Sequence, residues 1–259
     1  MSGFLRLIGK VSRGETVAAH NRNGRRSLGG RPIRHIGQIH KPSTPASAAA
    51  GATITYTDNA GLVSVTSVFT FSGRALGTPS ADRIILVGTY GNRFSAGIRS
   101  VSALTANGTS LSLVKDWGGA SNNTMEVWGG VVTSGATGDV VVTFAGGDMS
   151  CCGIMIGAIS GANTTVYATA SSTADPPSAG INVTAGGVVF AYAVNVNIAE
   201  SFTWTNATEK FDEAIQIAVA YHSGATDNYA TAQTPITVTA DPDQPISEGG
   251  LILVSYQAA

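Results

Sequence analysis

Short apolar stretches separated by turn-forming residues recur along the chain from residue 53 to residue 256. The stretches are of strand length, are rich in Val, Ile and Thr, and end at Gly, Asn, Asp or Pro. β-Branched side chains suit a pleated sheet, whereas the residues between the stretches suit tight turns. Since no apolar stripe of helical period continues beyond about two turns, the pattern predicts an all-β fold built as an antiparallel β-sandwich.

Three of the predicted strands share one pattern, a polar or glycine lead followed by four apolar residues. They lie at 82–88, 186–192 and 249–255. A continuous apolar run of this length indicates a strand that is buried on both faces, so we expect these three at central positions in their sheets. We interpret 207–214 as a short helix or a loop, and 215–221 as the strand that follows it.

The chain is poor in charge, because Asp, Glu, Lys and Arg together make up only 12% of its 259 residues. A typical soluble domain contains about 25% of these residues. A monomer with so little surface charge would expose a large uncharged area. We therefore expect a homo-oligomer, for which a trimer is one arrangement.

The charged residues are divided between two parts of the chain. Residues 1–41 carry seven Arg and two Lys against one Glu, a net charge of +8, whereas the remainder carries six basic and fifteen acidic residues, a net charge of −9. Residues 42–51 have the small-residue, proline-containing composition of a linker. This division predicts a basic extended arm at 1–41, a linker at 42–51 and a β-sandwich domain at 52–259, which we divide near 172–180 if it contains two subdomains.

The predicted arm combines basic residues with apolar residues near both of its ends. We expect assembly contacts from Phe4, Leu5, Leu7, Ile8, Arg22, Arg25, Arg26, Arg31, Arg34 and Ile36. The arm could also be a disordered tail, because it is too poor in apolar residues to form a core. Its apolar anchors favour a segment that becomes ordered on a partner protein. Aromatic residues for base stacking do not interleave with the arginines, so we expect no nucleic-acid partner.

The sequence favours a non-enzymatic protein without a cofactor or a metal. His222 stands beside Ser223 but in no nucleophile elbow, and Cys151 and Cys152 are immediate neighbours that can form no disulfide framework. The pairs Asp212 with Glu213 and Asp241 with Asp243 are the candidates for paired carboxylates, and neither has an aromatic cluster beside it. A calcium loop at 241–245 is an alternative to a rigid turn.

Trp128 and Trp204 are candidate aromatic residues for contact with a ligand, since sugars stack on aromatic rings. They keep two alternative functions open, a carbohydrate-binding module or lectin and a polysaccharide-degrading enzyme. Packing in the core is the competing role for both side chains. No apolar run reaches the about 18 residues of a membrane span, so we expect no membrane contact.

One region, approximately residues 80–160, resembles the β-sandwich domains of tailed-bacteriophage virion proteins. The pattern consists, in order, of the strands 83–88 and 98–104, a turn at 107–108, the strand 125–128, a turn at 135–138, and the strands 140–144 and 153–159. The resemblance implies a jelly-roll-like domain displayed on a phage head or tail, as a capsid decoration, head-fibre or tail-associated protein. It also implies folding in the host cytoplasm before assembly into the virion, with other virion proteins as the partners of the arm.

Overall fold

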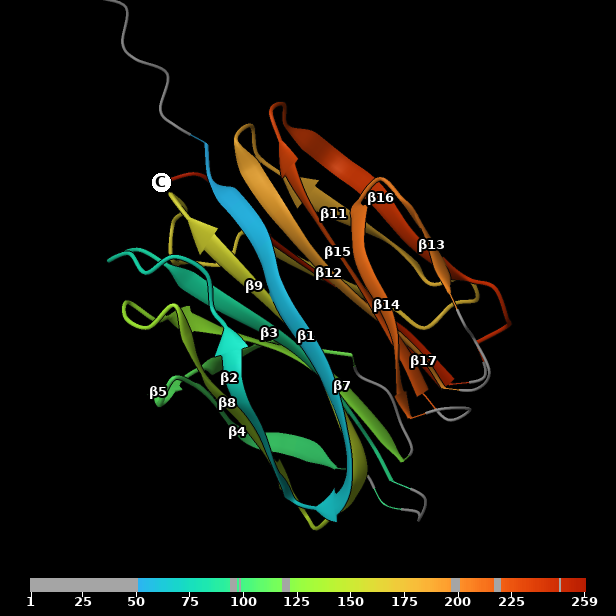
Figure 1. Cartoon of the computed structure of the whole chain (residues 1–259). Helices are drawn as coiled ribbons and strands as arrows, with labels where there is room; N and C mark the ends of the chain where they lie inside the picture. Colours follow the sequence, from blue (N-terminus) through green and yellow to red (C-terminus); the bar gives the residue numbers. More distant parts are fainter. Residues whose placement is uncertain are drawn as a thin grey trace, which may run out of the picture. The chain divides into compact units, whose positions relative to one another are not determined.

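The computed structural model describes residues 51–93, 97, 99–117, 122–196, 201–216, 220–246 and 248–259. In this part of the chain, seventeen strands form four antiparallel sheets (Figure 1). The predicted all-β fold is therefore confirmed. The predicted arm, its anchoring residues and all of the linker except Gly51 lie outside the described residues.

The first half of the described chain forms a β-sandwich, here called sandwich 1. Its inner sheet has the order β1 (Thr53–Thr66), β9 (Met149–Ser160), β3 (Ile84–Asn92), β7 (Asn123–Val131) and β6 (Ser112–Asp116). Its outer sheet has the order β2 (Val68–Ala75), β8 (Thr137–Ala145), β4 (Ser100–Ala106) and β5 (Thr109–Ser110).

The second half forms sandwich 2 in the same way. Its inner sheet has the order β10 (Ala168–Ser172), β17 (Glu248–Tyr256), β12 (Gly187–Val196), β15 (Ala220–Tyr229) and β14 (Thr208–Gln216). Its outer sheet has the order β11 (Ser178–Val183), β16 (Gln233–Pro242) and β13 (Phe202–Thr205). The chain passes from one sandwich to the other between Ser160 and Ala168, which is N-terminal to the predicted subdomain division near 172–180.

The two sandwiches have the same topology. If β5 is set aside, the remaining strands of sandwich 1 correspond in chain order to β10 through β17, and this correspondence reproduces the neighbours in both sheets. In each sandwich the inner sheet pairs the first strand with the last, and the outer sheet pairs the second with the next to last. This nested order is that of a jelly roll. The described chain thus contains two copies of a jelly-roll-like sandwich. Each copy agrees with the predicted fold class, an antiparallel, jelly-roll-like β-sandwich.

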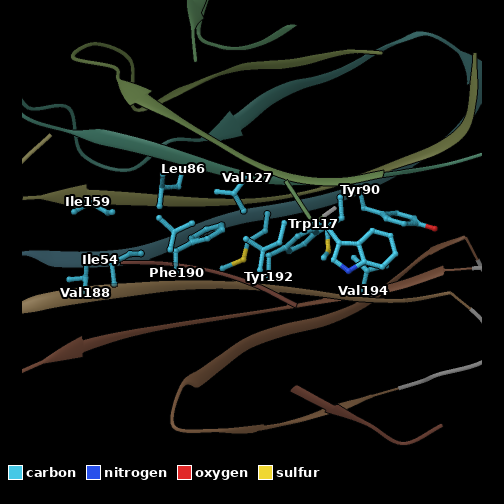
Figure 2. Packing of buried hydrophobic residues seen from close by; sticks show 14 of the residues in the cluster. Ile54, Leu86, Tyr90, Trp117, Val127, Ile159, Val188, Phe190, Tyr192 and Val194 are labelled. Carbon is cyan, nitrogen blue, oxygen red and sulfur yellow. The ribbon is translucent and has the colours of Figure 1, made fainter. Parts of the chain in front are cut away.

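The two inner sheets pack against each other and enclose a middle core. Leu86 and Val127 from sandwich 1 meet Val188, Phe190 and Tyr192 from sandwich 2 in this core (Figure 2). Each sandwich also has its own core between its inner and outer sheets. Both faces of each inner sheet are therefore buried, and the four sheets are held together by three consecutive apolar layers.

This arrangement explains the three continuous apolar runs of the sequence. All residues of β3 are buried, and its side chains alternate between the middle core, reached by Leu86, and the core of sandwich 1, reached by Val87. β12 and β17 are buried in the same way in sandwich 2. The prediction of central strands buried on both faces is confirmed for all three.

The prediction for 207–221 is wrong. Residues 208–216 form β14, an edge strand, and the predicted strand at 215–221 covers the end of β14 and the start of β15. Register shifts between Glu209 and Phe211 and between Ala214 and Gln216 interrupt the pairing of β14 with β15. These irregularities break the alternation of side chains by which a strand is recognised in a sequence.

Candidate functional site

A polar cluster lies where sandwich 1 and sandwich 2 meet, and it contains the histidine singled out in the sequence. His222 on β15 is fully buried, and its Nδ1 lies 3.0 Å from the hydroxyl of Tyr192 on β12. Its Nε2 lies 3.8 Å from Oε2 of Glu213, its register partner on β14. A tyrosine, a histidine and a glutamate in this order could also pass a proton to a bound substrate. Whether this cluster can do so depends on whether a substrate can reach it.

Burial fixes the protonation of this cluster. It raises the pKa of Tyr192 well above its ordinary value, so the hydroxyl keeps its proton and shares a hydrogen bond with Nδ1 of His222. Burial also lowers the pKa of His222, which Glu213 opposes only in part. His222 is therefore neutral at pH 7, and its buried Nε2 has no hydrogen-bond partner among the described residues, since the Glu213 carboxylate is 3.8 Å away. The nearby His222 lowers the pKa of Glu213, which stays ionised.

No substrate can reach the buried end of this cluster. Both Tyr192 and His222 have 0% of their surface exposed, and Tyr192 lies within the middle core. Glu213 is the accessible end, with 46% of its side chain exposed, and its carboxylate accepts a hydrogen bond from Asn59 of β1. The buried Tyr192–His222 contact thus joins two strands of sandwich 2, and the exposed Asn59–Glu213 hydrogen bond extends the cluster to sandwich 1.

The pH dependence of folding tests this description. Because the folded chain disfavours protonation of His222, the unfolded chain binds the proton first as the pH falls below about 6.5. The free energy of unfolding should then decrease toward the folded pKa, by at most about 1.4 kcal/mol per pH unit. Urea unfolding midpoints of the wild type and His222→Gln between about pH 5 and pH 8 should show this slope in the wild type only. Equal slopes would contradict the buried neutral imidazole.

Aromatic rings surround the same cluster on the side of sandwich 1. Tyr56 of β1 stacks on Phe211 of β14, with ring centroids 5.7 Å apart, and Phe211 lies edge-on to His222 at 4.9 Å. The hydroxyl of Tyr56 donates a hydrogen bond to Asn59, which in turn bonds Glu213. Strand β1 is therefore attached to β14 by both apolar and polar contacts.

A second polar cluster joins the sandwiches near the end of β3. The hydroxyl of Tyr90 donates to Oδ1 of Asn123 on β7 at 2.8 Å, and the amide of Asn123 donates to Glu248 on β17. Asn92 also donates to Asn123. Tyr90, Asn92 and Asn123 are all buried, so this cluster too serves as a polar contact inside the molecule.

The two candidate carboxylate pairs do not converge. Asp212 and Glu213 are neighbours on β14, so their side chains lie on opposite faces of the sheet. Glu213 bonds Asn59 of sandwich 1, whereas Asp212 accepts the backbone N–H of Phe202 on β13 in the outer sheet of sandwich 2. Among the described residues, no group of three or more His, Cys, Asp or Glu side chains is arranged to hold a metal ion, Asp241 and Asp243 included.

Comparison with known proteins gives no functional assignment for this chain. No family model and no curated protein matches this chain. What the chain does must therefore be argued from its own contacts.

The two candidate ligand-facing tryptophans lie in different sandwiches. Trp128 on β7 is only 9% exposed, packs in the core of sandwich 1, and donates its indole N–H to Oε2 of Glu126 at 2.7 Å. It therefore offers no open ring face to a sugar. Trp204 on β13 is half-buried against the core of sandwich 2, and its indole N–H donates to Ser223 at 2.8 Å.

Glu126 was missed in the sequence, although it organises the surroundings of Trp128. Its buried carboxylate accepts bonds from the indole of Trp128, the backbone N–H of Val101 at 2.9 Å and the hydroxyl of Thr124 at 3.2 Å. Burial nevertheless raises the pKa of Glu126. The sequence carries one signal for it, because a lone acid inside the apolar stretch 125–132 is either exposed or bonded within the core.

Cys151 and Cys152 are free, buried thiols on β9. They face opposite sides of the strand, Cys151 toward the middle core and Cys152 toward the core of sandwich 1. Burial raises the pKa of Cys151 to about 11 and raises that of Cys152 further. Both are therefore packed as small apolar side chains, and neither is activated as a nucleophile. In the described part of the chain there is no helix with the length and apolar character needed to span a membrane.

Proposed function

We propose that this chain is a non-enzymatic structural protein of a bacteriophage virion. Residues 1–41 would attach it to the head or tail, and the double sandwich would be the part displayed, as in a capsid decoration, head-fibre or tail-associated protein. The partners would be other virion proteins and further copies of the chain, in a homo-oligomer such as a trimer.

The observation that carries this proposal is the duplicated jelly roll with its shared middle core. Jelly rolls recur in viral capsid proteins and in lectins, where they form rigid modules for display and binding. Here two hydrogen bonds between side chains, Asn59 to Glu213 and Asn123 to Glu248, connect the two sandwiches, and each belongs to a polar cluster with buried members. Side chains that would serve catalysis elsewhere are used in this chain to fix two modules together, which suits a display role.

The charge division supports attachment through the arm. Residues 1–41 carry a net charge of +8, whereas the rest of the chain carries −9. A basic arm is attracted to an acidic protein surface, whether this belongs to a separate shell protein or to a neighbouring copy of the same chain. The apolar anchors, Phe4 to Ile8, would add contacts that salt does not screen.

Particle association tests the proposal directly. Antibodies against residues 51–259 should label phage particles purified on a density gradient from the lysate in which the chain is made, and the chain should co-sediment with them. Deletion of residues 2–41 should reduce incorporation at least about tenfold, since the arm is the proposed attachment. Full incorporation of the deletion variant would exclude the arm, and absence of the chain from all particles would exclude the virion role.

Two matched variants separate the contributions of charge and apolar contact within the arm. Replacing Arg22, Arg25 and Arg26 by Gln retains the apolar anchors, and replacing Leu5, Leu7 and Ile8 by Ser retains the charge. Attachment by charge should weaken strongly with salt for the serine variant and be clearly reduced in the glutamine variant, which keeps six of the nine basic residues of the arm. The opposite result would assign attachment to the apolar residues.

A further inference from the structure

The basic residues of the β region are few, and three of the six have a partner among the described residues. Beyond residue 41 the chain has four Arg and two Lys. Arg74 pairs with Asp58 at 3.6 Å, Lys115 pairs with Asp116 at 3.5 Å, and Arg83 is buried among backbone carbonyl groups. Among the described residues, Arg93 and Arg99 form no ion pair. Among the described residues, Arg93 and Arg99 have neither a carboxylate partner nor the carbonyl acceptors that surround Arg83, so their charges remain to be explained.

Both of these arginines line one hollow of about 520 Å³. It lies at the end of sandwich 1 where β1 ends, since Val65 of β1 lines it. Strand β1 ends at the bottom of Figure 1. The other lining residues are Val65, Gly146, Gly147, Asp148, Met149 and Ser150. This volume lies within the range of small-molecule sites, about 300–1,000 Å³. Two positive charges thus converge in a region of the chain that is otherwise acidic.

Arg99 is held in the hollow by the turn between β8 and β9. Its guanidinium lies over Gly146 and Gly147, where an added Cβ would approach Nη1 to 3.0 Å and Nη2 to 3.2 Å respectively. Both glycines have positive φ angles, +80° and +126°, so the turn itself favours glycine. The Nε atom of Arg99 is buried and has no hydrogen-bond partner among the described residues. An unpaired buried donor beside a hollow is a group for which a ligand would supply the missing acceptor.

The duplication provides an internal comparison for this hollow. Ser201 of sandwich 2 directly precedes β13, and it corresponds to Arg99, which directly precedes β4. Asp243 lies between β16 and β17, and it corresponds to the turn of Gly146 and Gly147 between β8 and β9. Ser201 and Asp243 close the corresponding position with a backbone hydrogen bond of 3.1 Å. An arginine at this position is therefore not required by the fold, because Ser201 takes the corresponding position in sandwich 2.

We propose that this hollow binds a small organic ligand through an oxyanion, a carboxylate or a phosphate ester, held by Arg93 and Arg99. The planar guanidinium matches both groups, because it can donate two parallel hydrogen bonds to either. Val65, 77% exposed at the rim, offers an apolar contact for the body of the ligand. An acidic sugar has both features, an oxyanion and an apolar ring face. Among the described lining residues Asp148 is the one carboxylate, and it opposes an anion, so the binding rests on the excess of positive charge.

Calorimetric titration of the full chain at low ionic strength tests this site with three probes: D-glucuronate, glucose 6-phosphate and the neutral sugar D-glucose. At least one of the acidic probes should bind more tightly than glucose, and the probe that does so identifies carboxylate or phosphate as the preferred group. Arg93→Gln and Arg99→Gln should each weaken that binding about tenfold, because each removes a charge-assisted hydrogen bond. Asp148→Asn should strengthen it about threefold by removing the repulsion.

Lys210→Gln is the matched control, because it removes one positive charge from an exposed position on β14, away from the hollow. It should change the affinity by less than about twofold. Thermal unfolding midpoints close to that of the wild type would show that the arginine variants are folded. Binding of all three probes with equal affinity, or binding that is insensitive to both arginine variants, would overturn the proposal. Neither result would bear on attachment to a virion, which depends on the arm.

Discussion

Replacing Arg83 with methionine should lower the free energy of unfolding by about 3 kcal/mol or more, since several buried carbonyl groups lose their donor at once. Arg83 is only 1% exposed and stands at the start of β3. Its Nε donates to Val132 at 2.8 Å, its Nη1 donates to Leu76, Gly77 and Gly135, and its Nη2 donates to Ser134 at 2.7 Å. One side chain thus fixes the loop before β3 and the loop after β7.

Two further variants test whether stability depends on the planar guanidinium of Arg83, whose donors are spread over three nitrogen atoms. Arg83→Lys keeps the charge but concentrates its donors at one atom, so it should recover only part of the lost stability. Arg74→Met removes a half-exposed pair with Asp58 and should cost less than about 1 kcal/mol. Urea unfolding followed by tryptophan fluorescence measures all three. A loss for Arg83→Met no larger than that for Arg74→Met would show that the carbonyl contacts contribute little.

Replacing Gly88 with alanine should lower the free energy of unfolding by about 2–3 kcal/mol, because the middle core has no room for the added methyl group. Gly88 lies in β3, and a Cβ on it would be 2.7 Å from Cγ of Tyr192 and 3.1 Å from its Cβ. The Tyr192 ring cannot move aside easily, since it is fully buried and its hydroxyl is bonded to His222. The variant therefore forces the two sandwiches apart or displaces the ring.

Gly180→Ala is the control for Gly88→Ala, because it makes the same change in an exposed strand. The added Cβ would lie 3.4 Å from the ring of Pro235, an ordinary contact. This control should change stability by less than about 0.5 kcal/mol. Denaturant midpoints with unchanged slopes would give both values. If Gly88→Ala were as stable as the control, the packing of Tyr192 against β3 would be looser than described.

The apolar pattern of the sequence was sufficient to identify the inner strands. The runs in β3, β12 and β17 are continuous because each strand has a core on both sides, and this is visible in the sequence without knowledge of the partner. Edge strand β14 was not recognised, because its register shifts break the alternation and its charged side chains, Glu209 and Glu213 among them, are also compatible with a helix. Pattern recognition therefore works best where burial is greatest.

The polar sites could not be predicted in the same way. His222 was visible as a lone histidine beside Ser223, but its partners Tyr192 and Glu213 come from other strands, and only strand pairing brings them together. Arg93 and Arg99 are two of the six basic residues beyond residue 41, and their closeness in the sequence was the one signal of the basic hollow. Gly146 and Gly147, which place Arg99, come from a turn far along the chain.

The sequence by itself determined the class of the fold, the burial of its central strands and the division of charge between arm and β region. These properties follow from composition and local period, which are read one segment at a time. Tertiary structure alone decided that the strands form two copies of one jelly roll with a shared core, and which polar side chains meet. The physical reason is that strand pairing and sheet packing are contacts between distant segments, and their register is set by the fit of side chains from both partners.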